Sequence, residues 1–216
     1  MIPQHHPSEE TLLVHAAGGF GDGMAFVLAS HLDCCESCRT IIAAAEAVGG
    51  VLLEEIAPET VSAETRCRVV ATIEREGPFE QLRHASPFLA TRGPLADLLE
   101  EREPSRGWTR LSPGVDHLLV SPELRLIRAE AGCCVPIHGH AGSELSLVLE
   151  GSYFGEHGLF GPGDLAEFGD DATRSPLADQ ARGCLLLVAS DGPYRPAAWL
   201  GRTIRRWSSI LSAPSG

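Results

Sequence analysis

Apolar residues along this chain follow a helical pattern in the first third and a strand pattern in the second half. Up to about residue 76, apolar positions lie three or four residues apart between helix start and stop signals. From residue 108 onward, short apolar runs alternate with glycine and proline turns, which is typical of strands. The pattern predicts an α+β chain in which helices precede an all-β region.

Start and stop signals predict four helices, at residues 9–17, 22–31, 39–48 and from 62 onward. Ser8 caps the first helix, and two glutamates favour its first turn. The Gly49-Gly50 pair is expected to end the third helix, whose apolar run at 41–48 is expected to pack on both sides. The fourth helix carries an apolar stripe formed by Cys67, Val70 and Ile73.

Six strands are predicted, at residues 115–120, 124–129, 145–149, 152–154, 165–168 and 183–188. Short strands separated by glycine-rich turns predict a sandwich or a barrel. Between the helices and the strands, residues 77–105 are punctuated by proline and glycine, which is typical of a segment between domains. We therefore expect a helical domain at residues 1–85, a linker at 86–107 and a β-domain at 108–216.

The charge of the chain favours a protein partner over nucleic acid. The 216 residues carry a net charge of −12, with a pI of about 5.1, and every basic residue is an arginine. Residues 1–85 hold 13 acidic residues against 5 arginines, a net of −8. Direct binding to nucleic acid is disfavoured by this excess, whereas a basic protein surface would be attracted to the acidic half.

Three features bear on the compartment of the protein. The first residues lack the basic and apolar segments of a secretory signal, and no run reaches the roughly 18 apolar residues of a membrane helix. The seven cysteines do not fit a paired disulfide framework. We expect a cytoplasmic protein without a membrane segment, in which cysteines act as ligands or free thiols.

A candidate zinc site lies in the first forty residues. His31, Cys35 and Cys38 are spaced i, i+4 and i+7, so they share one face of a helix or a helix end. His5 or His6 would complete a tetrahedral set. The alternative is that the cysteines are inert core residues. A structural zinc would stabilise helices that are too short to bury a core unaided.

A second candidate metal site lies in the β-region, in His138-Gly-His140-Ala-Gly-Ser-Glu144. The two histidines project from the same face of an extended segment, and Glu144 begins the next strand. Two imidazoles and a carboxylate inside a barrel can bind zinc, or can leave positions open for iron and oxygen chemistry. The alternative is a glycine-rich turn that carries polar residues on the surface.

The two motifs together resemble a known family. His138-x-His140-x-x-x-Glu144, followed by Gly161-Pro-Gly-Asp164, is similar to the motifs of a cupin barrel. Joined to the N-terminal histidine and cysteine motif, it resembles the ChrR family of zinc-dependent anti-sigma factors. The resemblance implies a small zinc-bound helical domain and an all-β cupin barrel. It also implies the zinc ligands of the helical domain, which are His6, His31, Cys35 and Cys38.

In the cupin half, the resemblance implies that His138, His140 and Glu144 are three of four metal ligands. The fourth position, a histidine in the family, is held here by Arg174. A guanidinium stays protonated and offers no lone pair to a metal. Zinc or another divalent metal would then be held by three ligands with water, or with His157 or Cys184. An empty pocket, or an anion bound at Arg174, are the alternatives.

The family resemblance implies that the helical domain sequesters an extracytoplasmic-function sigma factor. The cupin half would sense a stress signal that triggers release, with singlet oxygen and organic peroxide as the candidates. Oxidisable thiols give a chemical route, and those to watch, unless they are core residues, are Cys133, Cys134 and Cys184. The rival function is a metal-dependent dioxygenase or isomerase of the cupin type. Cupins also pair through their barrels, so a homodimer is a further expectation from the resemblance.

Overall fold

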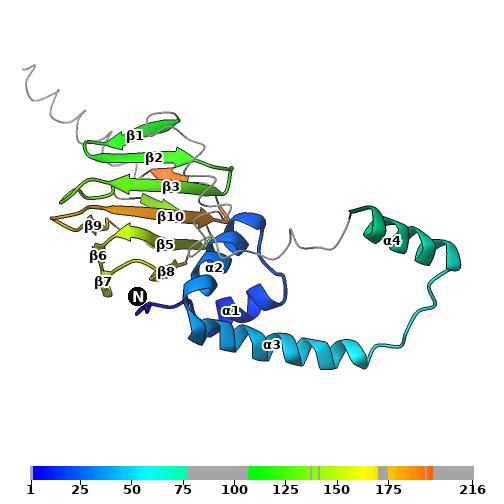
Figure 1. Cartoon of the computed structure of the whole chain (residues 1–216). Coiled ribbons are helices and arrows are strands. Elements are labelled where there is room, and N and C mark those ends of the chain that lie inside the picture. The colour runs from blue at the N-terminus through cyan, green and yellow to red at the C-terminus, as the bar shows by residue number, and fades with distance from the viewer. Residues whose placement is uncertain are drawn as a thin grey trace, which may run out of the picture.

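The computed structural model describes residues 2–76, 107–136, 138–140, 142–169, 175–192 and 194–196. Four helices come first, and an all-β region follows (Figure 1). The helices are α1 (Glu9–Ala16), α2 (Asp22–Cys34), α3 (Glu36–Glu54) and α4 (Ala63–Glu76). The expected fold class is therefore confirmed. The expected linker falls mostly on residues 77–106, which lie outside the described residues.

Eleven strands are described after residue 107. They are β1 (Trp108–Ser112), β2 (Val115–Leu119), β3 (Leu124–Ala129), β4 (His138–His140), β5 (Glu144–Gly151), β6 (Tyr153–Gly155), β7 (Gly158–Phe160), β8 (Leu165–Phe168), β9 (Leu177–Ala178), β10 (Cys184–Ser190) and β11 (Tyr194–Pro196). All six predicted strands are confirmed within a residue or two. The strands that the pattern missed are short or, like β1, lie at a sheet edge with mixed exposure.

The strands form one large antiparallel sheet and two small ones. The large sheet has the order β1-β2-β3-β10-β5-β8, so β8 is an edge strand. A three-stranded sheet, β7-β6-β9, and a two-stranded sheet, β11-β4, accompany it. One face of the large sheet packs on the three-stranded sheet through a core that includes Val148, Tyr153, Phe160 and Leu186.

The opposite face of the large sheet packs against α2, as Figure 1 shows. Met24, Val27 and Leu28 of this helix are almost completely buried and share one core with Leu147 and Leu187. Burying a side chain of this size contributes about 1.5–3 kcal/mol, so the contact is a substantial one. The helical module, residues 2–76, and the β-domain, residues 107–196, are therefore joined by apolar packing as well as by the chain.

Two predictions about α3 are wrong. The helix does not end at Gly49-Gly50 but runs on to Glu54, and neither glycine has a positive φ. A helical glycine costs only about 1 kcal/mol relative to alanine, which the following Val-Leu-Leu residues can offset. The run at 41–48 also does not pack on both sides, because Ile42 is its one buried side chain and Val48 is exposed.

The exposed helical surface continues on α4, which stands apart from the sheet and from the other helices in Figure 1. Its predicted stripe is present, but Val70 and Ile73 are about half exposed and Cys67 is exposed. The stripe therefore has no core to face among the described residues. None of the helices that the structure describes combines the length and the apolar character needed to cross a membrane.

Candidate metal centre

Three segments of the helical module bring four metal-ligand side chains together. His6 lies just before α1, His31 lies near the end of α2, and Cys35 and Cys38 lie where α2 gives way to α3. One ligand atom from each residue lies within 4.8 Å of the others. His31, Cys35 and Cys38 are buried, whereas His6 is exposed and closes the cluster from outside.

The distances in the cluster fit a tetrahedral zinc ion. With Zn–S near 2.3 Å and Zn–N near 2.0–2.1 Å, tetrahedral geometry places sulfur and nitrogen ligands about 3.5 Å apart. Sγ of Cys35 and of Cys38 lie 3.3 Å and 3.5 Å from Nδ1 of His6. Nε2 of His31 lies 3.4 Å from Sγ of Cys38. The four side chains therefore have the chemistry and the spacing to hold zinc.

A single extended residue between two helices creates this geometry. Cys35 has φ −117° and ψ 103°, and it separates the end of α2 from the first turn of α3. The break turns the chain so that Cys38, one turn into α3, meets His31 from the last turn of α2. The N-terminal end of a helix also favours negative charge, which suits thiolate ligands.

Charged forms of the Cys38 thiol and the His31 imidazole are unfavourable in this cluster unless a metal cation is bound. Burial and the neighbouring Cys35 raise the pKa of the Cys38 thiol to about 12. Burial lowers the pKa of the His31 imidazole. Both shifts favour neutral side chains, so a bound metal must displace the thiol protons as it binds.

The structure decides between the neighbouring residues that the sequence left open. His5 points away from the cluster, because its ring stacks on Phe160 at 3.9 Å and its Nε2 contacts the carbonyl of Leu159 at 3.1 Å. Cys34 donates its thiol to the carbonyl of His31 at 3.2 Å and lies outside the cluster. His6 is therefore the histidine that joins the cluster.

The second candidate site is described only in part. Residues 138–140 form β4, in agreement with the expected extended segment, and Glu144 begins β5. Glu144 is buried and lines a cavity with Tyr153 and Phe168. The side chains of the two histidines, and the whole of Arg174, lie outside the described residues. The convergence of His138, His140 and Glu144 therefore stays a prediction.

The expectation that Cys184 could act as a substitute fourth ligand is wrong. It lies opposite Gly151, whereas Ser190, six residues along β10, lies opposite Glu144. At about 3.3 Å per residue, the thiol is roughly 20 Å from the carboxylate. Burial also raises the pKa of Cys184 to about 11, which makes it an inert core thiol. The other expected substitute, His157, lies exposed in the turn between β6 and β7.

Comparison with known proteins identifies the family. The chain is 32% identical to the anti-sigma-E factor ChrR of Cereibacter sphaeroides, over 97% of this chain and 100% of that protein. This chain belongs to the ChrR family of anti-sigma factors. The crystal structure of Rhodobacter sphaeroides SigE in complex with the anti-sigma ChrR matches it with a TM-score of 0.71 and 34% identity. That match covers 88% of this chain and 100% of the ChrR chain.

An RmlC-like cupin from Ralstonia eutropha JMP134 matches 55% of this ChrR-type chain and 96% of its own, with 14% identity and a TM-score of 0.34. No protein-family model matches the chain.

The sequence missed the groups of the β-domain that contact the metal cluster of this ChrR-type chain. His31 donates from Nδ1 to the carbonyl of Gly163 at 2.8 Å, which leaves Nε2 for the cluster. Asp164 accepts hydrogen bonds from backbone amides next to His6. A backbone carbonyl has no sequence signature, and these residues lie about 130–160 positions from their partners.

Proposed function

We propose that this protein is a cytoplasmic anti-sigma factor that binds an extracytoplasmic-function sigma factor through its helical domain, residues 1–85. Its relative ChrR is described as the anti-sigma-E factor, and the matching crystal structure holds ChrR with SigE. Bound in this way, the sigma factor would be kept from RNA polymerase and from promoter DNA. The role is regulatory and not enzymatic.

The observation that carries this proposal is a pair of exposed apolar stripes on the helical module. They consist of Val48, Val51 and Leu52 on α3, and of Val69, Val70 and Ile73 on α4. Each of these side chains is 45–62% exposed. Contiguous apolar surface of this kind on a monomer marks a place where another protein binds. The two apolar stripes are therefore the proposed contact surface for the sigma factor.

Charge supports the choice of partner. The helical domain has a net charge of −8, and Glu54 and Glu55 follow the stripe on α3 directly. Surfaces that dock on DNA and polymerase are basic, so a sigma factor is attracted to an acidic surface. Apolar contacts then supply affinity at the centre, while the surrounding charges supply orientation and speed of association.

The proposed role of zinc in the helical domain is structural. The core shared by α1 and α3 is small, with Leu12, Cys35, Cys38 and Ile42 as its buried members. Four protein ligands leave no open coordination position for a substrate. A bound zinc would hold the segment before α1 to the junction of α2 and α3, which fixes the direction in which α3 projects its apolar stripe.

For the β-domain, residues 108–216, we propose a sensing role and a divalent metal held by His138, His140 and Glu144. The cavity beside Glu144 supports this, since it leaves space next to a buried carboxylate that can act as a metal ligand. Zinc and iron both suit this set of ligands. The rival function, a cupin enzyme, gives no role to the helical domain and its closed metal site.

Replacing Glu144 with glutamine is expected to remove the metal of the β-domain and to leave the N-terminal zinc in place, because the substitution keeps the shape but loses the ligand charge. Metal analysis of the full chain after zinc saturation and gel filtration would measure this as a fall in bound metal. Glu150→Gln, an exposed position on the same strand, is the matched control. Equal metal content in both variants would contradict the proposed ligand.

Co-expression tests the proposed function directly. The full chain and the sigma factor encoded beside its gene are expected to purify as a stable one-to-one complex that contains zinc. The complex should also block promoter-specific transcription by polymerase carrying that sigma factor. Failure to form a complex in zinc-replete medium would contradict the proposal. Turnover of a small substrate by the iron-loaded chain would then favour the cupin enzyme.

A further inference from the structure

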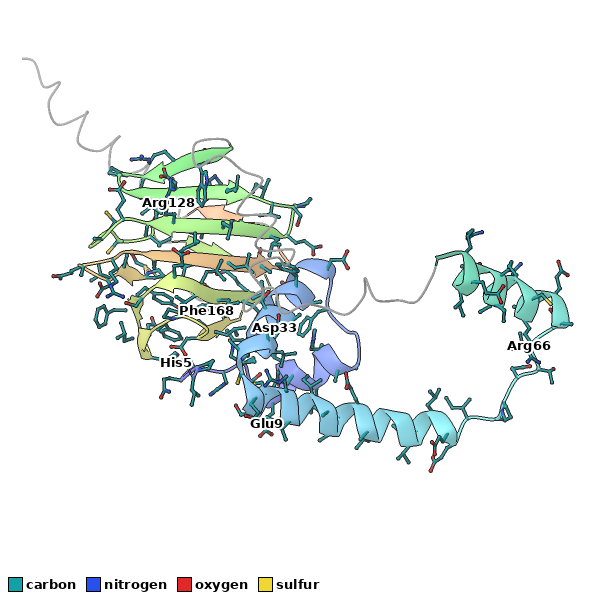
Figure 2. All side chains as sticks on the ribbon, viewed as in Figure 1. His5, Glu9, Asp33, Arg66, Arg128 and Phe168 are labelled. Carbon is teal, nitrogen blue, oxygen red and sulfur yellow. The ribbon has the colours of Figure 1, made fainter. Side chains whose placement is uncertain are left out.

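The N-terminal strap, which we define as residues 2–8, carries the zinc ligand His6 and lies on the β-domain. The N-terminus reaches the β7–β8 side of the β-domain in Figure 1, and Figure 2 places His5 at this boundary. The amide of Leu165, the first residue of the edge strand β8, donates to the carbonyl of His5 at 3.1 Å. The strap is therefore held by the sheet before it enters α1.

Two carboxylates of the β-domain, the buried Asp164 and the exposed Glu167, fix the ends of the strap. Asp164 is 4% exposed, and its Oδ1 accepts the amides of Gln4 at 2.5 Å and His5 at 3.0 Å. Glu167 accepts the amide of Ser8 at 2.9 Å and the hydroxyl of Thr11. Hydrogen bonds from amides to a charged acceptor are stronger than those between neutral groups. His6 therefore sits between two anchor points that both belong to the β-domain.

The same stretch of the β-domain also orients His31. The carbonyl of Gly163 accepts from Nδ1 of His31, the outer-shell contact that sets the tautomer and ring orientation of a metal-binding histidine. Gly163 has φ +89°, and a Cβ there would lie 3.1 Å from Sγ of Cys34 and 3.2 Å from the ring of Pro3. A glycine lets this turn approach α2 and the strap together.

We infer that Gly163, Asp164 and Glu167 of the β-domain are positioning residues of the N-terminal metal site, so that zinc binding and docking of the strap on β8 form one linked equilibrium. The inference rests on the proposed zinc site. Linkage is reciprocal: if docking raises the affinity for zinc by some factor, zinc raises the stability of the docked strap by the same factor. The N-terminal zinc thus belongs to both domains.

The linkage gives the β-domain cavity a physical route to the zinc site. Phe168 of β8 lies opposite Glu144 of β5, and both line the cavity. Tyr153, another cavity residue, stacks on Phe160 at 4.9 Å, and the other stacking partner of Phe160 is His5. A change in the cavity that shifts β8 or Tyr153 would therefore alter how the strap packs on the β-domain. The position of His6, and with it the affinity for zinc, would then change.

The test measures zinc affinity of the full chain by competition with a chromophoric chelator. Every chain, the reference included, carries Glu144→Gln, so that zinc is measured at the N-terminal site and any effect of Glu144→Gln itself is common to all. Asp164→Asn and Glu167→Gln are each expected to weaken zinc binding about tenfold, and the pair up to about 100-fold, because each substitution removes a charged acceptor that holds the strap and so positions His6. Asp179→Asn is the matched control, because Asp179 also caps backbone amides in a β-domain turn but does not touch the strap. The zinc affinity of Asp179→Asn should stay within about twofold of the reference chain.

Hydrogen exchange supplies a second measurement that does not depend on substitutions. Removing zinc from the wild-type chain is expected to speed exchange of the amides of Gln4, His5 and Leu165, while amides of β10 keep their protection. Unchanged exchange at these three amides, or equal zinc affinity in all the variants, would overturn the linkage and leave the zinc site intact. A wild-type chain that binds no zinc would overturn both.

Discussion

Replacing Cys35 with serine, or His31 with alanine, is expected to abolish zinc binding by the helical domain and, with it, the complex with the sigma factor. Each substitution leaves three ligands around a cluster whose four members lie within 4.8 Å of one another. Structural zinc sites contribute on the order of 10 kcal/mol to folding, far more than the small core of α1 and α3 can replace. Bound zinc at this site should fall from about one per chain to a trace.

The same chain offers a matched control for the first prediction. Cys34 is the neighbour of Cys35, but its thiol donates to a backbone carbonyl outside the cluster. Cys34→Ser is expected to bind zinc and sigma factor as the wild type does. Metal analysis and co-purification would be carried out on all three variants together. Zinc loss in Cys34→Ser with full zinc in Cys35→Ser would mean that the proposed ligand set is wrong.

Placing glutamate in both apolar stripes, as Leu52→Glu with Ile73→Glu, is expected to disrupt sigma-factor binding without disturbing the fold. Both side chains are at least half exposed in the free chain, 59% and 50%, so their replacement breaks no internal packing. Interface residues of this kind carry about 2–4 kcal/mol each, so the pair should weaken binding by roughly 1,000-fold or more. The measurement is a titration of labelled sigma factor.

A control for the second prediction must place glutamate elsewhere on exposed apolar surface, for comparison with each stripe substitution taken singly. Leu119→Glu meets this need, because Leu119 is 56% exposed at the end of β2, in the β-domain and not on the helices that carry the stripes. It is expected to bind as the wild type does, and zinc content and thermal unfolding should match among all the variants. Equal loss of binding in the control would point to a general charge effect and against a specific interface.

The pattern of apolar residues predicted the order of elements well because each period reports a local geometry. It failed where a local stop signal is overridden by the residues that follow it, and where the outcome depends on distant partners. The Gly49-Gly50 pair looks like a helix end, yet α3 continues through it. The apolar positions of α2 predict a helix but do not say that Val27 and Leu28 pack on the large sheet. Short strands such as β7 and β9 are set by their neighbours and carry little pattern of their own.

The metal cluster was predictable in its local part only. His31, Cys35 and Cys38 follow from their spacing, which fits one helix face or a helix end, and the structure places them at the junction of α2 and α3. The choice of His6 over His5 came from the family resemblance, and the structure agrees because His5 stacks on Phe160. The contribution of Gly163 was out of reach, since a carbonyl is present at every residue and only the fold selects one.

The distance along the chain between the partners of the zinc site affects how the protein is made. His31 and the carbonyl that orients it are 132 residues apart. At a synthesis rate of about 5–20 residues per second, roughly 7–26 s pass on the ribosome between the two. Throughout that interval β10, whose Leu187 shares the core of α2, has not yet been made, and His31 lacks its hydrogen-bond partner. The metal site of the nascent chain therefore reaches its final form only when synthesis of the β-domain is well advanced.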